Sequence, residues 1–223
     1  MIGARSNAPS HEVSVPPLGL AGTLTLPADS RSLVVFAHGS GSSRFSPRNR
    51  AVADALNERA IATLLFDLLS EEEEADRANV FDIALLAERL AQAVGWIERE
   101  PRLRRLPLGF FGASTGAAAA LVAAARLGTR VGAIVSRGGR PDLAGAALDA
   151  LTTPTLLIVG GADFGVIELN EAALARLKGP KRIEIVPGAT HLFPEPGALE
   201  AVAARAARWF ETYLTRGGAR SAG

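Results

Sequence analysis

Short apolar runs alternate along the chain with longer stretches whose apolar residues recur every three or four positions. The runs at 33–37 and 61–66 contain almost no polar residues, which is typical of strands that helices cover on both faces. Four more runs predict strands toward the C-terminus: 108–112, 131–136, 155–159 and 182–186. Such an alternation of buried strands and helices predicts a mostly parallel α/β sheet, whose ligands lie beyond the carboxyl ends of the strands.

The segments around these strands complete the expected fold. Two alternating segments, 11–15 and 20–26, flank the sequence PPLG and predict an antiparallel hairpin at the edge of the sheet. The helices are expected in the intervening stretches: 46–59, 79–99, 114–127, 143–151, 167–177 and 198–214. Ser46 and Asn79 are the expected caps of the first two helices, and the acidic stretch 70–77 is expected to be a solvated loop or helix start.

The chain has 223 residues and no stretch with the composition of an interdomain linker. We therefore expect one α/β domain over residues 12–215, with flexible ends at 1–11 and 216–223. The connection at 137–153 has room for little more than a short helix. No large lid is therefore expected over the carboxyl edge of the sheet, which favours small substrates.

Composition narrows the class of protein further. With 48% hydrophobic residues, 21% charged residues and a formal net charge of +1, the chain is expected to be a soluble globular protein without a broad nucleic-acid-binding surface. The absence of cysteine excludes a disulfide framework, a thiolate metal site and a cysteine nucleophile. The sequence has neither the apolar region of a secretory signal nor a run long enough to span a membrane, so the expected location is the cytoplasm.

The strongest chemical signal is the sequence GASTG at 112–116, a G-x-S-x-G pattern between a predicted strand and an alanine-rich helix. A serine on so tight a strand-to-helix turn adopts a strained backbone conformation, and the glycines on both sides avoid collisions within the turn. The hydroxyl of Ser114 then stands above the sheet, and the N–H of Thr115 at the helix start faces the position of a developing oxyanion. We therefore predict that Ser114 is a nucleophile.

A serine nucleophile needs a histidine base and a carboxylate that orients the base. Of the three histidines, one lies on the N-terminal hairpin and one in the loop after the first parallel strand, which leaves His191 after the last strand. Asp163 follows the preceding strand and completes the chain order Ser, Asp, His that accompanies this type of turn. We therefore predict a triad of Ser114, Asp163 and His191. Other acids fit this order or this edge of the sheet less well: Asp67, Asp142 and Glu195.

The loop after the first parallel strand reads HGSG and begins at His38. In the predicted arrangement this loop supplies a second oxyanion donor, for which the backbone N–H of Ser40 is the candidate beside that of Thr115. His38, Gly39 and Gly41 are further candidate substrate contacts, since glycines let the main chain approach a substrate. A glycine-rich structural turn or a phosphate-binding loop would have a similar composition.

Two arginines are candidate contacts for a negatively charged substrate. Arg44 lies in the same loop as Ser40, and Arg137 directly follows a predicted strand, so both are expected near the carboxyl edge of the sheet. The structural alternative is that Arg44 pairs with the acidic residues 71–74 and that Arg137 anchors a loop. No metal or cofactor is expected, because the histidines are scattered and neither zinc-site spacing nor a phosphate-loop pattern occurs.

Six segments together resemble the dienelactone-hydrolase-like family of the α/β-hydrolase superfamily, in its branch with a serine nucleophile. They are HGSGSSRFSPRN, DLLSEEEEADR, GFFGASTGAAAAL, VSRGGRPDL, LIVGGADFGVIELN and VPGATHLFPEPGAL. The resemblance covers residues 12–214 and implies an α/β-hydrolase fold with an eight-stranded sheet, no separate cap domain, and Ser114, Asp163 and His191 as the triad. Dienelactone hydrolases have cysteine at the nucleophile position, so Ser114 favours ordinary esters. Relatives of this branch also occur fused to phosphoribosyltransferase domains, for which this chain has no length left.

These observations lead to a functional hypothesis. We expect a serine hydrolase that cleaves small carboxylic esters through an acyl-enzyme intermediate and whose partner is its small-molecule substrate. The sequence does not define an oligomeric state. A lactone, thioester or peracid reaction on the same triad is the enzymatic alternative, and a non-catalytic binding module with this fold is the alternative of a different class.

Overall fold

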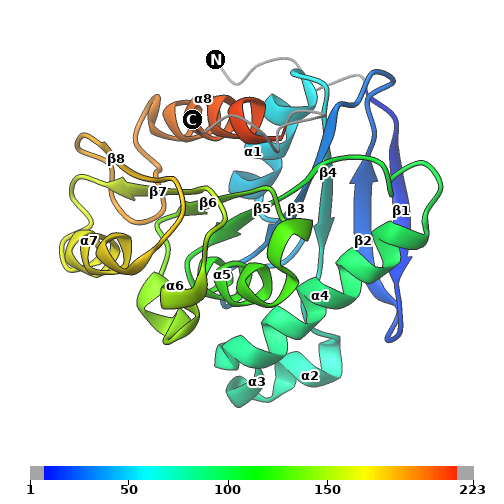
Figure 1. The fold of residues 1–223 in the computed structure, drawn as a ribbon, viewed down its shortest axis with the longest axis horizontal. Coiled ribbons are helices and arrows are strands. Elements are labelled where there is room, and N and C mark those ends of the chain that lie inside the picture. Colours follow the sequence, from blue (N-terminus) through cyan, green and yellow to red (C-terminus); the bar gives the residue numbers. More distant parts are fainter. Residues whose placement is uncertain (1–7, 215–223) are drawn as a thin grey trace.

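The computed structural model describes residues 8–214, whose strands form one eight-stranded sheet (Figure 1). The strands are β1 Ser10–Val15, β2 Leu20–Thr25, β3 Ser32–Ala37, β4 Ile61–Phe66, β5 Leu108–Ala113, β6 Ala133–Arg137, β7 Thr155–Gly160 and β8 Lys181–Val186. Their order across the sheet is β1-β2-β4-β3-β5-β6-β7-β8. The pairs β1/β2 and β2/β4 are antiparallel and the remaining pairs are parallel. The predicted mostly parallel α/β sheet is therefore confirmed.

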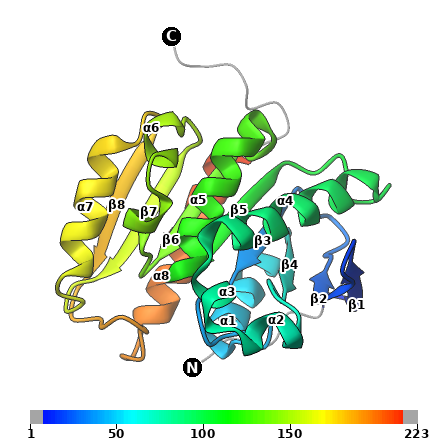
Figure 2. The same ribbon diagram turned by 90° about the horizontal axis from the view of Figure 1, so that it is seen from below.

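Helices cover both faces of this sheet (Figures 1 and 2). On one face, α1 (Pro47–Asn57) and α8 (Ala198–Tyr213) bury one apolar core against the strands. On the other face, α4 (Ile83–Arg99), α5 (Thr115–Leu127) and α7 (Val166–Arg176) bury a second core. Shorter helical segments lie in the connections: α2 Glu71–Ala75, α3 Arg77–Phe81, α6 Ala147–Ala150 and the 3₁₀ turns Gly128–Arg130 and Pro141–Ala144.

The continuous apolar runs of the sequence follow from this two-sided burial. All six residues of β3 are buried. Leu33 and Val35 belong to the core under α4 and α5, whereas Val34 and Phe36 belong to the core under α1 and α8. Because successive side chains of a strand point to opposite faces, a strand between two helical layers has no position that favours a polar residue.

Two local features differ from the predicted elements, and a third decides between two expected forms. Asp82, rather than Asn79, caps α4, because its side chain accepts a hydrogen bond of 2.9 Å from the backbone N–H of Leu85. The acidic stretch is a helix start rather than a loop, the second of the two expected forms, because α2 begins at Glu71 and α3 follows from Arg77. The helix expected at 143–151 is divided into a 3₁₀ turn and α6, because Gly145 between them adopts a positive φ of 55°.

The connection between β6 and β7 contains only the turn Pro141–Ala144 and α6, so the described residues include no inserted cap domain. The flexible ends expected at 1–11 and 216–223 fall outside the described residues apart from 8–11, and Ser10 and His11 already pair in β1. Among residues 8–214, no helix combines the length and the apolar composition that crossing a membrane requires.

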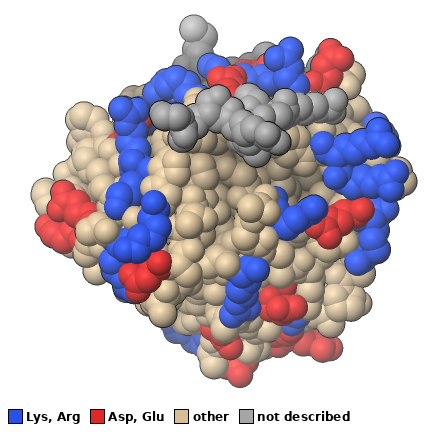
Figure 3. All heavy atoms as spheres, viewed as in Figure 1, with Lys and Arg blue, Asp and Glu red and all other residues tan. Residues whose placement is uncertain are grey.

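Charges of both signs are spread over the surface. On the face drawn in Figure 3, basic and acidic side chains lie next to one another around a large uncharged area. The ion pairs of the described residues include Arg176 with Asp149 and Arg140 with Asp142, each at 2.7 Å. Phe164, directly after Asp163, is the most exposed of the large apolar residues in the described chain, at 81%.

The start of α5 lies unusually close to the end of β3. A Cβ atom on Gly116 would lie 2.3 Å from the carbonyl oxygen of Ala37 and 2.4 Å from that of His38. Contacts this short are not tolerated between non-bonded atoms, so the absence of a side chain at Gly116 lets the helix start at this position. The same contact holds the loop after β3 against the turn after β5.

We therefore expect Gly116→Ala to destabilise the protein by about 2–3 kcal/mol or to prevent folding, because both obstructing atoms belong to the backbone. Gly95→Ala is the matched control, since Gly95 lies within α4 and its Cβ would meet only the side chain of Arg99, at 3.7 Å. That control is expected to stabilise the protein by about 0.5–1 kcal/mol. Urea unfolding of both variants measures the difference, and equal stabilities would contradict the packing argument.

Candidate active site

Ser114 lies on the turn between β5 and α5 and is partly exposed. Its backbone has φ 51° and ψ −122°, outside the regions that residues with side chains normally occupy. The surrounding backbone maintains this conformation: the N–H of Ser114 donates to the carbonyl of Arg137 at 3.3 Å, and its own carbonyl accepts from Ala117 and Arg140 at 3.1 Å each. The side chain does not cap the helix, which leaves the hydroxyl available for chemistry.

His191 and Asp163 come from two loops at the same edge of the sheet. The Nδ1 atom of His191 lies 2.8 Å from a carboxylate oxygen of Asp163, and the two loops are joined by a hydrogen bond from the N–H of Ala162 to the carbonyl of Ala189 at 2.9 Å. The side chain of Asp163 is only 10% exposed, whereas that of His191 is 38% exposed. A shielded carboxylate on Nδ1 fixes the orientation of the imidazole and leaves Nε2 free to exchange a proton.

The segment 138–140 lies between His191 and the serine turn. A Cβ atom on Gly138 would be 3.0 Å from the carbonyl oxygen and 3.5 Å from the Nδ1 atom of His191, while the N–H of Arg140 donates to the carbonyl of Ser114. Within the described residues, the Ser114 hydroxyl and His191 share no hydrogen bond. In serine hydrolases this bond commonly tightens only when the substrate binds.

The loop after β3 approaches the serine through its main chain. A Cβ atom on Gly39 would lie 3.0 Å from the Cβ atom of Ser114, so a side chain at this position would crowd the nucleophile. The N–H of Ser40, which the sequence places as an oxyanion donor, donates to the hydroxyl of Thr115 at 2.9 Å. This bond joins the two predicted donor segments, but it also means that an oxyanion must compete with Thr115 for that N–H. The sequence pattern predicted a role for the backbone of Thr115 but not for its hydroxyl. The only signal in the sequence is that a hydroxyl residue directly follows the serine.

The His38 side chain connects two loops of the fold. Its side chain is buried, its Nδ1 atom lies 3.1 Å from the carbonyl oxygen of Gly39, and its Nε2 atom accepts from the N–H of Leu68 at 3.1 Å. Both ring nitrogens are therefore occupied, and burial lowers the pKa of the imidazole below 6.5. The neutral ring joins the loop after β3 to the loop after β4, while Gly41, with a φ of 67°, turns the chain beyond it.

Arg44 and Asp67 form a second connection between the same two loops. The backbone N–H of Arg44 donates to Asp67 at 2.8 Å, and its guanidinium forms an ion pair with the same carboxylate. Glu12 on β1 lies 3.6 Å from the guanidinium. Arg44 thus pairs with Asp67 and Glu12 rather than with the acidic residues 71–74 considered above. Asp67, the competing acid, is thus paired with Arg44, whereas the carboxylate partner of His191 is Asp163.

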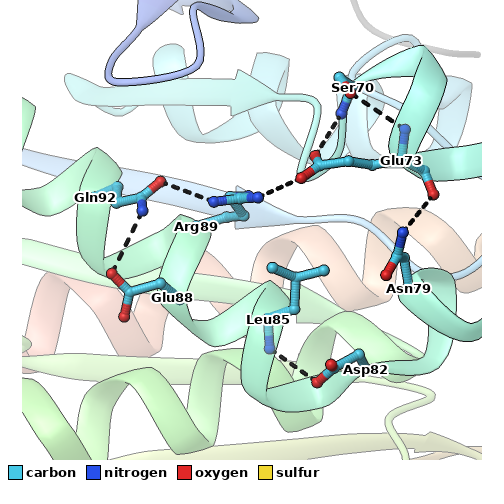
Figure 4. A network of polar contacts seen from close by, with 8 residues as sticks. All are labelled: Ser70, Glu73, Asn79, Asp82, Leu85, Glu88, Arg89 and Gln92. Carbon is cyan, nitrogen blue, oxygen red and sulfur yellow. Dashed lines mark hydrogen bonds and ion pairs between the residues drawn. The ribbon is translucent and has the colours of Figure 1, made fainter.

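A polar network joins α2, α3 and α4 (Figure 4). Ser70 and Glu73 cap α2 reciprocally, with bonds of 3.0 and 3.2 Å. Glu73 also forms an ion pair with Arg89 of α4, and its backbone carbonyl accepts from the Asn79 side chain at 3.0 Å. Glu73 of the acidic stretch therefore caps α2 and connects it to α4. The pairing with Arg89 was not predicted from the sequence.

Arg137 occupies the last position of β6, and its side chain is 6% exposed. Its carbonyl accepts the N–H of Ser114, but its guanidinium lies near Asn49 of α1, with a separation of 3.5 Å between Nη2 and the Asn49 side-chain oxygen. The sequence placed Arg137 close to the carboxyl edge but did not indicate this burial. In the described part of the chain, no group of three or more His, Asp or Glu side chains could hold a metal ion.

Comparison with known proteins agrees with this geometry. Residues 48–215 match the model of the dienelactone hydrolase family. Two Mycobacterium tuberculosis proteins, from strains H37Rv and CDC 1551 / Oshkosh, that carry the provisional name phosphoribosyl transferase are each 58% identical over 203 residues. The match covers 91% of this chain and 46% of each relative, so the chain spans about half the length of these curated relatives.

Solved structures give the same picture of the fold. A dienelactone hydrolase from Anabaena variabilis ATCC 29413 is 52% identical, with a TM-score of 0.89 and coverage of 95% of this chain and 100% of that chain. Est1E from Butyrivibrio proteoclasticus has a TM-score of 0.76 at 17% identity and covers 91% of this chain and 98% of its own, a likeness of fold alone.

The buried neutral state of His38 predicts a pH dependence of stability. Because the folded protein lowers this pKa below 6.5, the unfolded chain binds the proton more tightly. The stability gained from keeping His38 neutral is therefore fully present above pH 6.5. As the pH falls toward the folded-state pKa, the free energy of unfolding decreases by at most about 1.4 kcal/mol per pH unit. In His38→Gln, which keeps an acceptor for the N–H of Leu68, the free energy of unfolding should no longer show this decrease at low pH.

Chemical unfolding between pH 5 and 8 measures the pH dependence of the free energy of unfolding. His11→Gln is the control, because His11 is exposed. An unchanged pH profile in His38→Gln would refute the assignment.

Proposed function

The chain belongs to the dienelactone hydrolase family, and from this premise we propose that it is a serine hydrolase of small carboxylic esters. The family and its structural neighbours support hydrolase activity. One observation carries the proposal of a Ser114–His191–Asp163 triad. It is the hydrogen bond of 2.8 Å between His191 and the shielded Asp163, at the same edge of the sheet as the strained Ser114. This pair leaves Nε2 of His191 available for proton exchange at the edge of the sheet where Ser114 lies.

The proposed reaction has two halves. Ser114 attacks the acyl carbon while Nε2 of His191 takes the hydroxyl proton, which is then returned to the leaving alcohol. Water releases the acyl group from Ser114 with His191 again acting as base. Asp163 holds the proton on Nδ1 and stabilises the charged imidazolium. Asp67 is already paired with Arg44. This pairing supports Asp163, rather than Asp67, as the acid of the triad.

We assign the backbone N–H groups of Ser40 and Thr115 to the tetrahedral oxyanion. The close approach of Gly39 to Ser114 supports this assignment, since it brings the backbone of the loop over the reacting atom. The N–H of Ser40 donates to the Thr115 hydroxyl at 2.9 Å, so the substrate oxygen replaces or shares that acceptor. Thr115 is the first residue of α5, where backbone N–H groups have no partner within the helix.

Small esters fit better than long-chain esters because the described chain contributes no cap helices over this edge. Ser114 in place of a cysteine favours esters over the lactone that gives the family its name. A lactone, thioester or peracid would use the same triad and remains the enzymatic alternative, and a binding module without activity is the alternative of another class. The phosphoribosyl transferase name belongs to proteins about twice as long, and we assign the half that this chain matches to the hydrolase.

A fluorophosphonate probe tests the nucleophile without knowledge of the substrate. We expect the native protein to be labelled in a 1:1 ratio, and Ser114→Ala to lose both labelling and hydrolysis of 4-nitrophenyl acetate. Ser42→Ala, in the neighbouring loop, is the matched control and should retain both. Intact-mass measurement follows the labelling, and thermal unfolding checks that the variants remain folded. Undiminished hydrolysis in Ser114→Ala would exclude the proposed mechanism.

The identity of the acid is tested by comparing two aspartates. Asp163→Asn should lower kcat by about 10⁴ because it removes the acceptor that sets the His191 tautomer. Asp67→Asn should act mainly on stability, by about 1 kcal/mol, because it weakens the partly buried pair with Arg44. Steady-state kinetics and urea unfolding separate the two effects, and a larger loss of kcat in Asp67→Asn would reverse the assignment.

A further inference from the structure

A small cavity adjoins the loop that approaches Ser114. Residues 39–41 of this loop line the cavity, together with residues 68–69 after β4 and Leu86 of α4. Val80 of α3 completes the apolar part of the lining. The cavity has a volume of about 10 Å³, which is room for about one water molecule or one methyl group.

This cavity lies beside the proposed oxyanion site. Ser40, whose backbone N–H we assign to the oxyanion, lines the cavity, as does Gly39. A Cβ atom on Gly39 would lie 3.0 Å from the Cβ atom of Ser114 and 3.7 Å from its hydroxyl oxygen. A substrate carbonyl bound between Ser114 and the N–H of Ser40 would therefore lie next to the cavity.

The order of the strands indicates which half of an ester the cavity faces. Strand β5, which precedes Ser114, lies between β3 on one side and β6, β7 and β8 on the other. His191 follows β8 and lies next to the loop after β6, where a Cβ atom on Gly138 would be 3.5 Å from its Nδ1 atom. The leaving alcohol takes its proton from His191, so the alcohol faces this side. The cavity lies on the opposite side, at the loops after β3 and β4, and therefore faces the acyl group.

The lining of the cavity favours an uncharged aliphatic group. Its apolar side chains belong to the core on the α4 and α5 face of the sheet or pack against that core: Leu68, Leu69, Val80 and Leu86. Glu74 of α2 also lines the cavity, and its carboxylate would repel a negatively charged acyl group. The neighbouring cation, Arg44, is already paired with Asp67. A short neutral acyl group is therefore the best match to this space.

We propose that this cavity holds the acyl group of the substrate and that Val80 limits this group to the size of acetyl. The proposal rests on the esterase function proposed above and narrows its substrate class to acetyl esters. The methyl group of acetyl fills the cavity, whereas a longer chain must displace a packed side chain. Val80 is half-buried in the five-residue helix α3, so of the apolar lining residues it is the one that can change with least damage to the core.

The side that faces the leaving alcohol is built differently. Phe164 directly follows Asp163, and Leu192 directly follows His191, and these two large side chains are 81% and 47% exposed. Exposed side chains can move aside for a larger group, so we expect little selection by the size of the alcohol. The size limit therefore applies to the acyl half of the ester.

Hydrolysis of 4-nitrophenyl acetate, propionate and butyrate tests the size limit, with each rate divided by the rate of the same ester with hydroxide ion. In the native protein, kcat/KM should fall by about 10-fold or more from acetate to butyrate. In Val80→Ala, which shortens one wall of the cavity, the ratio of butyrate to acetate should rise by about 10-fold. Phe81→Ala is the matched control and should keep the native ratio, because Phe81 neighbours Val80 in α3 but is 50% exposed and does not line the cavity.

A second series of esters varies the alcohol instead of the acyl group. Ethyl acetate and butyl acetate should be hydrolysed with similar kcat/KM, and Val80→Ala should leave the ratio of the two unchanged. If Val80→Ala changes this ratio and not the ratio of butyrate to acetate, the cavity holds the alcohol and the proposal is overturned.

Thermal unfolding shows which variants are folded. Should Val80→Ala fail to fold, Val80→Ile replaces it and should lower kcat/KM for the acetate ester by about 10-fold, because its additional methyl group occupies the cavity. Equal kcat/KM for acetate and butyrate in the native protein, or native values in a folded Val80 variant, overturns the proposal. Labelling by the fluorophosphonate without a preference for acetyl overturns the size limit alone, whereas a native protein that is neither labelled nor active on any ester overturns the proposed function and the size limit together.

Discussion

The close approach of two backbone segments, the end of β3 and the start of α5, is the constraint on which the rest of the site depends. Gly116 permits it, because any side chain there would overlap the carbonyl oxygens of Ala37 and His38. Once α5 begins at this distance from β3, the turn after β5 has too few residues to relax, and Ser114 is held at a positive φ. This packing contact acts together with the backbone hydrogen bonds of Ser114 to Arg137, Ala117 and Arg140 to hold the serine in its strained conformation.

The polar side chains around this contact act mainly as connections between loops. Neutral His38 joins the loops after β3 and β4, and the ion pair of Arg44 with Asp67 joins them a second time. The pair of Glu73 with Arg89 holds the next segment against α4. Loops at the carboxyl edge have few apolar residues to bury, so hydrogen bonds and ion pairs replace packing as the means of positioning them.

Arg137 and Arg48 are the exception to this arrangement. Arg137 ends β6 at this edge of the sheet, yet its buried guanidinium has no carboxylate partner among the described residues. Glu195 is directed to Thr190 instead, and Arg59 is directed to Glu211.

The sequence by itself determined the elements of the sheet, the serine turn, and the order of serine, aspartate and histidine at one edge. Those features arise from local rules: apolar runs for strands buried on both faces, and glycines around a serine where a strand turns sharply into a helix. Only the tertiary structure decided which charges meet, as in the pairing of Arg44 with Asp67, the burial of both nitrogens of His38, and the isolation of Arg137 beside Arg48. Such pairings depend on angles and distances between segments far apart in the chain, and a one-dimensional pattern of polar residues carries no information about them.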